Sequence, residues 1–174
     1  MSTATTTRRR FSLPGELPPQ AVVALQDSRE QLPLDLAPLR VEVATLPTGD
    51  YSVRGLEHVV AIERKSLGDL LSCVGQERER FDREVQRLLG FPTRALVVEA
   101  SWADLEAGQW RSQITPAQAI GSLLGWIAAG LPCILAGDHH RAGRFTSRLL
   151  FTVARRRWRE LRALAGHVLE PLEV

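Results

Sequence analysis

Short runs of hydrophobic residues, each ended by a turn-forming residue, occupy the first third of the chain. Such runs are typical of buried β-strands. Pro47 and Gly49 end the second run, and Gly55 separates two clusters of β-branched residues that we expect to pair as a hairpin. The predicted strands cover residues 21–27, 39–46, 51–54 and 59–64.

The hydrophobic spacing changes after Ser66. From Leu67 to Gly90 apolar residues recur every three or four positions, which predicts two amphipathic helices separated near Gly75. A last helix of the same kind is predicted over 139–162. The side chains that this spacing directs to the core are Phe145, Leu149, Val153, Leu161 and Leu164.

Two continuous apolar runs, 94–100 and 132–137, are typical of strands buried on both faces, and we expect a helix after each. The helix between them begins at Thr115, which precedes Pro116 and Gln118 in a capping pattern. Strands that alternate with helices after an initial meander predict an α/β fold, with a mixed central sheet flanked by helices.

Length and composition favour one globular domain, because 174 residues that are 44% hydrophobic suffice for one core. We expect a flexible N-terminal tail over 1–18, a domain over 19–165 and a C-terminal tail over 166–174. No run of about 18 apolar residues predicts a membrane span. Cys73 and Cys133 lie in separate apolar stretches, which fits a reduced, cytoplasmic protein.

Lys65 is the only lysine among 22 basic residues, so the chain is rich in arginine. Arginine suits phosphate binding. A genome rich in G and C would produce the same bias, however, and a net charge of +2 discriminates little between classes of function. The position of the single lysine is more informative than the total charge.

Lys65 lies two residues after Glu63, so on a strand both side chains project from one face, while Arg64 projects from the other. Asp50 opens the partner strand of the predicted hairpin, which brings it near Glu63. Two carboxylates and an ammonium group are the side chains that Mg²⁺-assisted phosphodiester hydrolysis requires. An exposed Glu63–Lys65 pair, with Asp50 serving the turn, is the alternative.

A second metal ion would need a further acid. Asp27, at the end of the first predicted strand, is one candidate, and Glu30 is a weaker one. Asp69 holds Lys65 or caps the following helix in this interpretation.

The residues around these candidates resemble the signature of the XPF-type structure-specific endonucleases: Gly-Asp, a spacer, Glu-Arg-Lys, three residues and Asp. In this chain the corresponding residues are Gly49, Asp50, Glu63, Arg64, Lys65 and Asp69. Asp27, Arg29 and Glu30 resemble the family's upstream Asp-x-Arg-Glu, and Arg80-Phe81 resembles the start of its arginine-rich helix. The resemblance covers roughly residues 21–150.

This resemblance implies a restriction-endonuclease-like three-layer fold, and Mg²⁺- or Mn²⁺-dependent cleavage of branched, flap or fork DNA in repair or recombination. The residues that it associates with catalysis are Asp50, Glu63, Arg64, Lys65 and Asp69, and we expect Arg64 to serve the fold or an ion pair. The candidate metal ligands are Asp50, Glu63, Asp27 and Glu30. The candidate DNA contacts are Arg29, Arg80, Arg83 and Arg87, and for the last three, which lie on a predicted helix, a solvated helix face is the alternative.

Many relatives carry a tandem helix-hairpin-helix module after the nuclease domain. Here the chain ends at Val174, so we expect a partner or a dimer to substitute for that module. Phe151 and Trp158 share a helix face with Arg155 and Arg162, a mixture that predicts a homodimer or heterodimer contact. The alternative is that Trp158 covers an edge of the core.

Two other functions stay open on the sequence alone. One is a catalytically silent DNA-binding or scaffold subunit of the same fold. The other is a junction resolvase or a defence nuclease that shares only the fold.

Overall fold

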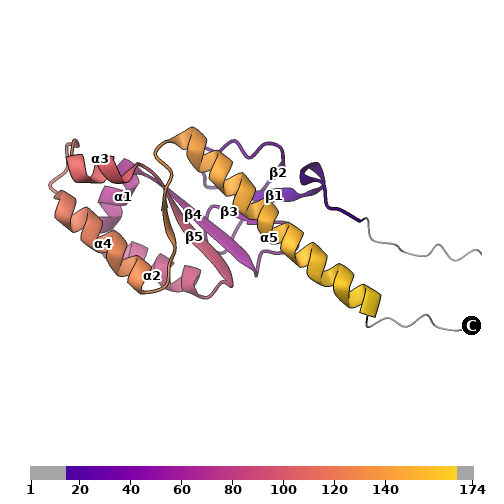
Figure 1. The fold of residues 1–174 in the computed structure, drawn as a ribbon. Helices are drawn as coiled ribbons and strands as arrows, with labels where there is room; N and C mark the ends of the chain where they lie inside the picture. The colour runs from indigo at the N-terminus through magenta and orange to yellow at the C-terminus, as the bar shows by residue number, and fades with distance from the viewer. Residues whose placement is uncertain (1–14, 168–174) are drawn as a thin grey trace, which may run out of the picture.

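A mixed six-stranded sheet lies at the centre of the protein (Figure 1). This computed structural model describes residues 15–167. The strands are β1 (Val23–Asp27), β2 (Arg40–Ala44), β3 (Tyr51–Val53), β4 (Val60–Ser66), β5 (Thr93–Glu99) and β6 (Cys133–Leu135). Their order is β2-β1-β3-β4-β5-β6, in which β3 is antiparallel to both of its neighbours and all other pairs are parallel.

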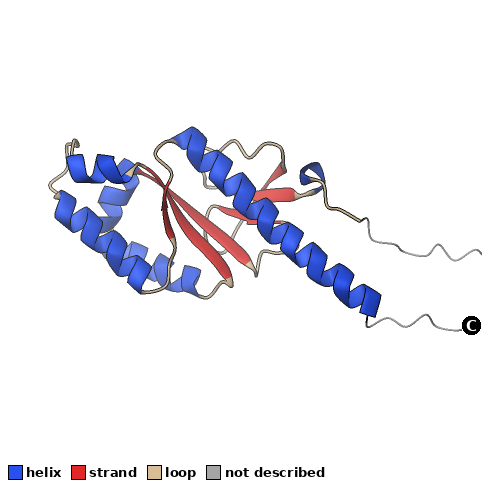
Figure 2. Cartoon of the chain, in the orientation of Figure 1, coloured by secondary structure: helices blue, strands red, loops and turns tan. Residues whose placement is uncertain are grey.

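Helices cover both faces of this sheet (Figure 2). They are α1 (Leu67–Val74), α2 (Arg78–Leu89), α3 (Trp102–Ala107), α4 (Pro116–Ala128) and α5 (His139–His167), with a short 3₁₀ turn at Pro19–Ala21. Helix α5 packs on one face, and α1, α2 and α4 pack on the other. The predicted three-layer α/β architecture, with a mixed sheet flanked by helices, is confirmed.

The alternation of side chains along β4 determines which residues face which layer. Val60 and Ile62 belong to the core under α5, whereas Ala61 belongs to the core under α1, α2 and α4. Continuing this alternation, Glu63 and Lys65 face the layer of α2, and Arg64 faces the layer of α5. The opposite projection expected for these three side chains is therefore confirmed.

Strand β4 runs into helix α1 without an intervening loop. Ser66 is the last residue of the strand and also the N-cap of the helix. Its hydroxyl accepts a hydrogen bond from the Asp69 backbone N–H at 3.1 Å, and its own N–H donates to the Asp69 carboxylate at 3.2 Å. This capping box satisfies backbone donors that the first turn of a helix leaves free.

Three expectations from the hydrophobic pattern were wrong. The run 132–137 yields only the short, half-buried edge strand β6, not a strand buried on both faces. Leu161 and Leu164, expected in the core, are 50% and 58% exposed, because the last turns of α5 extend past the sheet (Figure 1). The helix itself continues to His167 instead of ending at 162.

Helix α3 was not predicted as a separate element, although Ser101 and Asp104 form a capping box that marks its start. The expected tails fall largely outside the described residues, which exclude 1–14 and 168–174. Of the helices described, none is both long and apolar enough to cross a bilayer.

Candidate active site

The β3–β4 hairpin places Asp50 against the strand that carries Glu63. The Asp50 N–H donates to the Ile62 carbonyl at 2.8 Å, and the Arg64 N–H donates to Asp50 Oδ2 at 2.8 Å. Gly49 has a φ of +77°, and a Cβ at this position would lie only 3.0 Å from the Ile62 carbonyl oxygen. Glycine therefore allows this close approach of the two strands.

Glu63 and Lys65 form an ion pair between Oε1 and Nζ on the α2 side of β4. Their side chains are only 8% and 15% exposed. The ammonium group also lies 5.4 Å from the ring centroid of Phe81 on α2, which is held in turn by an edge-to-face contact with Trp126. The single lysine is thus fixed by a carboxylate and an aromatic ring.

The carboxylates of Asp50 and Glu63 are unfavourable in their charged forms without a further cation, because both are buried and they repel each other. Burial, followed by the charge of Glu63, raises the pKa of Asp50 to about 7. Burial also raises the pKa of Glu63, and Lys65 offsets this only in part. For Lys65, burial acts to lower the pKa, but Glu63 and then Asp50 outweigh it, so the pKa is raised.

These groups border a cavity of about 360 Å³ between the start of β3, the middle of β4 and helix α2. The residues that line it are Asp27, Arg29, Pro47, Thr48, Gly49, Asp50, Glu63, Lys65, Arg80, Phe81, Glu84 and Arg87. The cavity brings together Asp50, Glu63 and Lys65, the three residues central to the sequence-based hypothesis.

Asp27 lies in the wall of the same cavity, but its carboxylate already has partners. Oδ1 accepts from the Arg29 Nε at 2.6 Å, and Oδ2 accepts from the Leu46 N–H at 2.7 Å. The hydrogen bond from Arg29 is the main reason why the pKa of Asp27 falls to about 2. The structure therefore shows Asp27 as an anchor for Arg29 and the 46–49 turn.

Glu30 and Asp69 also have other partners. Glu30 Oε1 accepts from the Leu32 N–H at 2.9 Å and lies 3.6 Å from a guanidinium nitrogen of Arg64. Asp69 is exposed, and Ser66 Oγ donates to its Oδ2 at 2.6 Å. Of the two roles considered for Asp69, the structure shows the helix cap.

Glu84 was missed by the sequence analysis. It lies on α2 three residues after Phe81, a spacing that places both side chains on one face of the helix. Its Oε2 pairs with Arg87, whereas its Oε1 is buried and has no hydrogen-bond partner among residues 15–167. Helical spacing from Phe81 is the signal that points to Glu84 as a further carboxylate lining the cavity, beside those of Asp27, Asp50 and Glu63.

Exposed arginines surround the cavity. Arg29 and Arg80 are each 70% exposed and Arg87 is 51% exposed, although each has an acidic partner. Arg83 is exposed and forms no ion pair within the described part of the chain. The guanidinium groups that border the cavity are in reach of an incoming phosphate backbone.

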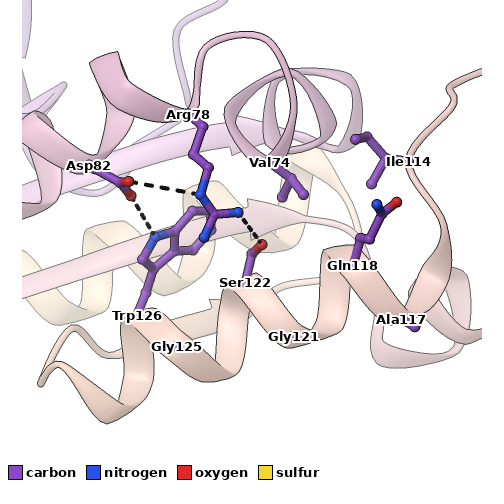
Figure 3. A pocket seen from close by; sticks show the side chains of 10 residues that line it. All are labelled: Val74, Arg78, Asp82, Ile114, Ala117, Gln118, Gly121, Ser122, Gly125 and Trp126. Atoms are coloured by element: carbon purple, nitrogen blue, oxygen red, sulfur yellow. Dashed lines mark hydrogen bonds and ion pairs between the residues drawn. The ribbon is translucent and has the colours of Figure 1, made fainter.

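A second cavity, of about 400 Å³, lies between α2 and α4 (Figure 3). Arg78 reaches across it, with Nη1 donating to Ser122 Oγ at 3.4 Å and Nε 3.9 Å from the Asp82 carboxylate. Asp82 also accepts from Trp126 Nε1 at 3.5 Å. Because Asp82 is the one acid in its lining, this cavity offers no pair of carboxylates.

The donor set around Asp50 suits a magnesium-like ion. In the part of the chain that the structure describes, no group of three or more His, Cys, Asp or Glu side chains is arranged to hold a metal. Mg²⁺, however, takes one or two carboxylates from a protein and keeps several waters. Asp50 and Glu63 supply two hard oxygen donors at a buried site with excess negative charge, so the residues present fit this ion.

Comparisons with known proteins identify a family and two similar structures. The model of the ERCC4 domain family matches residues 20–149. The structure of XPF from Aeropyrum pernix is similar, with a TM-score of 0.62 and 18% identity over 83% of this chain and 73% of that chain. XPF from the same organism in complex with DNA gives a TM-score of 0.59 and 16% identity, covering 78% of this chain and 66% of that chain. No curated protein matches the chain. The structural similarity shows a restriction-endonuclease-like fold.

Proposed function

The chain belongs to the ERCC4 domain family of XPF-type DNA nucleases, and on this premise we propose that it is a divalent-metal-dependent DNA endonuclease. The proposed active site is Asp50, Glu63 and Lys65. The reaction is hydrolysis of a phosphodiester bond, which leaves a 5′-phosphate and a 3′-hydroxyl. Branched DNA, such as a flap or a fork, is the proposed substrate.

One observation carries this proposal: two buried carboxylates share a cavity in which a single ammonium group is fixed beside them. Asp50 forms no salt bridge of its own within residues 15–167. A buried group of charges that serves only the fold is expected to carry equal numbers of positive and negative charges. An unbalanced, buried negative charge that is open to a cavity is what a cation site requires.

Each residue has a distinct task in the proposed reaction. Asp50 and Glu63 would hold the divalent ion, and the Arg64 N–H orients the Asp50 carboxylate from behind. When bound, Mg²⁺ or Mn²⁺ would supply the positive charge that polarises the phosphate and activates water. Lys65, held by Glu63 and Phe81, would donate a hydrogen bond to the phosphoryl oxygen on which negative charge develops.

The remaining candidates have supporting roles in this proposal. Asp27 anchors Arg29 at the rim of the cavity, and Asp69 fixes the start of α1 directly after Lys65. Arg29, Arg80 and Arg87 would contact the phosphate backbone, which positions DNA without reading its sequence. The proposal takes Asp50 and Glu63 as the protein ligands of the ion, because the carboxylates of Asp27 and Glu30 already have hydrogen-bond partners and that of Glu84 pairs with Arg87.

The proposal is tested by incubating the full chain with labelled flap, fork, four-way junction and plain duplex DNA, in Mg²⁺, Mn²⁺ or a chelator. We expect metal-dependent cleavage that is strongest on a branched substrate and is lost in Asp50→Asn. Glu16→Gln, at an exposed acid that forms no ion pair among the described residues, is the control and should cleave normally. Cleavage that persists in the chelator, or no cleavage of any substrate, would contradict the proposal.

We also propose a dimer contact through the distal part of α5. Phe151 and Trp158 are only partly buried, and Arg155 stacks 5.5 Å from the centroid of the Phe151 ring. The Nε1–H group of Trp158 is buried and has no hydrogen-bond acceptor among the described residues. The nearby Leu161 is half exposed. A mixture of aromatic, aliphatic and arginine side chains is typical of interface centres.

Light scattering tests this contact. Trp158→Glu should reduce the molar mass in solution from a dimer to a monomer, because it would bury a charge in the interface. Trp102→Glu, at an exposed tryptophan of α3, is the control and should leave the mass unchanged. An unchanged mass for Trp158→Glu would exclude this face as the interface.

A further inference from the structure

The side chain of Arg64 lies on the face of β4 opposite the cavity, within a buried group of charges. It is 8% exposed, its Nε donates to Glu99 Oε1 at 2.7 Å, and Nη1 lies 3.6 Å from Glu30 Oε1. The backbone N–H of the same residue donates to Asp50 Oδ2 at 2.8 Å. One residue thus contacts the buried acids with its side chain and the Asp50 carboxylate with its backbone N–H.

His139, the first residue of α5, completes this group. Its Nδ1 lies 2.6 Å from Glu99 Oε1, and its Nε2 lies 3.3 Å from the carbonyl oxygen of Pro33. A carboxylate and a carbonyl are both acceptors, so only an imidazolium, with a proton on each ring nitrogen, can donate to both. Both ring nitrogens of His139 can therefore donate at once only when the ring is protonated.

The charges of the group balance when His139 is protonated. Arg64 and His139 then carry two positive charges, and Glu30 and Glu99 carry two negative charges. Burial acts to raise the pKa of Glu99, but the hydrogen bonds from Arg64 and His139 outweigh it and hold this pKa below its ordinary value. Loss of the His139 proton leaves an excess negative charge against the Arg64 guanidinium.

The other charged groups next to His139 do not compensate for this excess. On its own helix, Asp138 Oδ2 lies 3.3 Å from the Arg141 Nε, and both side chains are more than half exposed. From the strands, Glu99 of β5 is the contacting charge, and Arg64 of β4 and Glu30 of the loop after β1 reach His139 only through it.

The contact with Pro33 also connects α5 to the loop that covers the start of β3. In that loop the Leu34 N–H donates to the hydroxyl of Tyr51 at 2.9 Å, and the hydroxyl of Ser147 on α5 donates to the Leu36 carbonyl at 2.9 Å. Tyr51 immediately follows Asp50. The start of α5 therefore restrains Asp50 along two routes, through Arg64 and through this loop.

We propose that Glu99 and protonated His139 are positioning residues of the active site, which hold Arg64 and thereby the Asp50 carboxylate in its working orientation. This inference rests on the proposed nuclease function. It assigns a positioning role to two residues that do not line the cavity.

The test compares single-turnover cleavage rates and KM of the wild type, His139→Gln and His139→Arg between about pH 6 and pH 9 at saturating Mg²⁺. Outer residues that orient a metal ligand typically contribute 10–100-fold, so His139→Gln should be about tenfold slower near pH 6 with little change in KM. The deficit should shrink as the pH is raised, because a neutral imidazole in the wild type cannot donate to both Glu99 and Pro33 either. His139→Arg keeps a permanent cation and should exceed the wild type at the upper end of the range.

The neighbouring His140→Gln is the matched control, because His140 is an exposed histidine on the same helix turn. It should follow the wild type at every pH. A ratio of wild type to His139→Gln that does not change with pH would reduce His139 to a packing role and overturn the proposal. Equal rates near pH 6 would overturn it as well.

A measurement without substrate separates this inference from the proposed function. In NMR spectra near pH 6, Glu99→Gln should shift both the Nε–H signal of Arg64 and the ring signals of His139. If the wild type cut no DNA, the proposed function would fail while these spectra still reported on the contacts. Unchanged signals in Glu99→Gln would refute the positioning role by themselves.

Discussion

Replacing Asp50 by Asn should make the metal-free protein more stable near pH 8 while removing its activity. Burial and Glu63 raise the pKa of Asp50 from 3.8 to about 7 on folding, so the folded protein disfavours the charged carboxylate. Such a group stabilises the fold below its ordinary pKa, and this contribution is lost as the pH rises towards about 7. A shift of this size corresponds to at most ~4 kcal/mol at ~1.4 kcal/mol per pH unit.

The expected gain is smaller than this limit, on the order of 1–3 kcal/mol, because water in the cavity screens the charge. The amide oxygen that Asp50→Asn introduces can still accept the hydrogen bond from the Arg64 N–H. Urea unfolding in a chelator, near pH 8 and near pH 4.5, measures the difference. The variant should be the more stable protein near pH 8, and the gap should shrink near pH 4.5.

Two additions make this experiment decisive. Mg²⁺ should raise the free energy of unfolding of the wild type but not of Asp50→Asn, because binding to the native state alone stabilises it. Glu16→Gln, at an exposed acid, should match the wild type at both pH values. The electrostatic reasoning is refuted if Asp50→Asn is less stable than the wild type near pH 8.

Three further predictions concern single residues. Lys65→Ala should slow single-turnover cleavage by ~10²–10³-fold while Mn²⁺ affinity, measured by calorimetry, changes little; a rate near that of the wild type would remove Lys65 from the reaction. Gly49→Ala should lower the free energy of unfolding in urea by ~1–3 kcal/mol, because Gly49 has a positive φ and a Cβ there would lie 3.0 Å from the Ile62 carbonyl oxygen. An unchanged urea midpoint would contradict that close approach. Arg83→Ala should weaken duplex binding equally across sequences and reduce the slope of log affinity against log salt by about 1; an unchanged slope would assign Arg83 to the solvated surface.

The central hairpin and its chemistry were accessible from the sequence because they depend on local rules. The two-residue spacing of Glu63 and Lys65 determines that they share a face of β4, and Gly49 marks where the chain turns tightly before Asp50. Neither inference needs any knowledge of distant contacts. The same local reasoning predicts the strands between residues 21 and 100.

What could not be predicted depends on contacts between distant segments. Glu99 and His139 are 40 positions apart, and no periodic pattern links them. The spacing that directed Leu161 and Leu164 inward is correct as helical spacing, yet it cannot show that the sheet ends before those residues. The hydrogen-bond partners of Asp27 could not be predicted either, because the Leu46 N–H reaches its carboxylate from a turn nineteen residues away in the sequence.

The direct passage from β4 to α1 sets a limit on how this chain can change in length. One extra residue between Lys65 and Asp69 would rotate the apolar stripe of α1 by about 100° away from the core, and one residue fewer within β4 would turn the lysine to the far side of the sheet. The exposed residues 111–113, in the connection between α3 and α4, have no such constraint. Length variants of this protein should therefore be viable at that connection and inviable at the junction, so the strand that carries Lys65 and the first helix act as one rigid part.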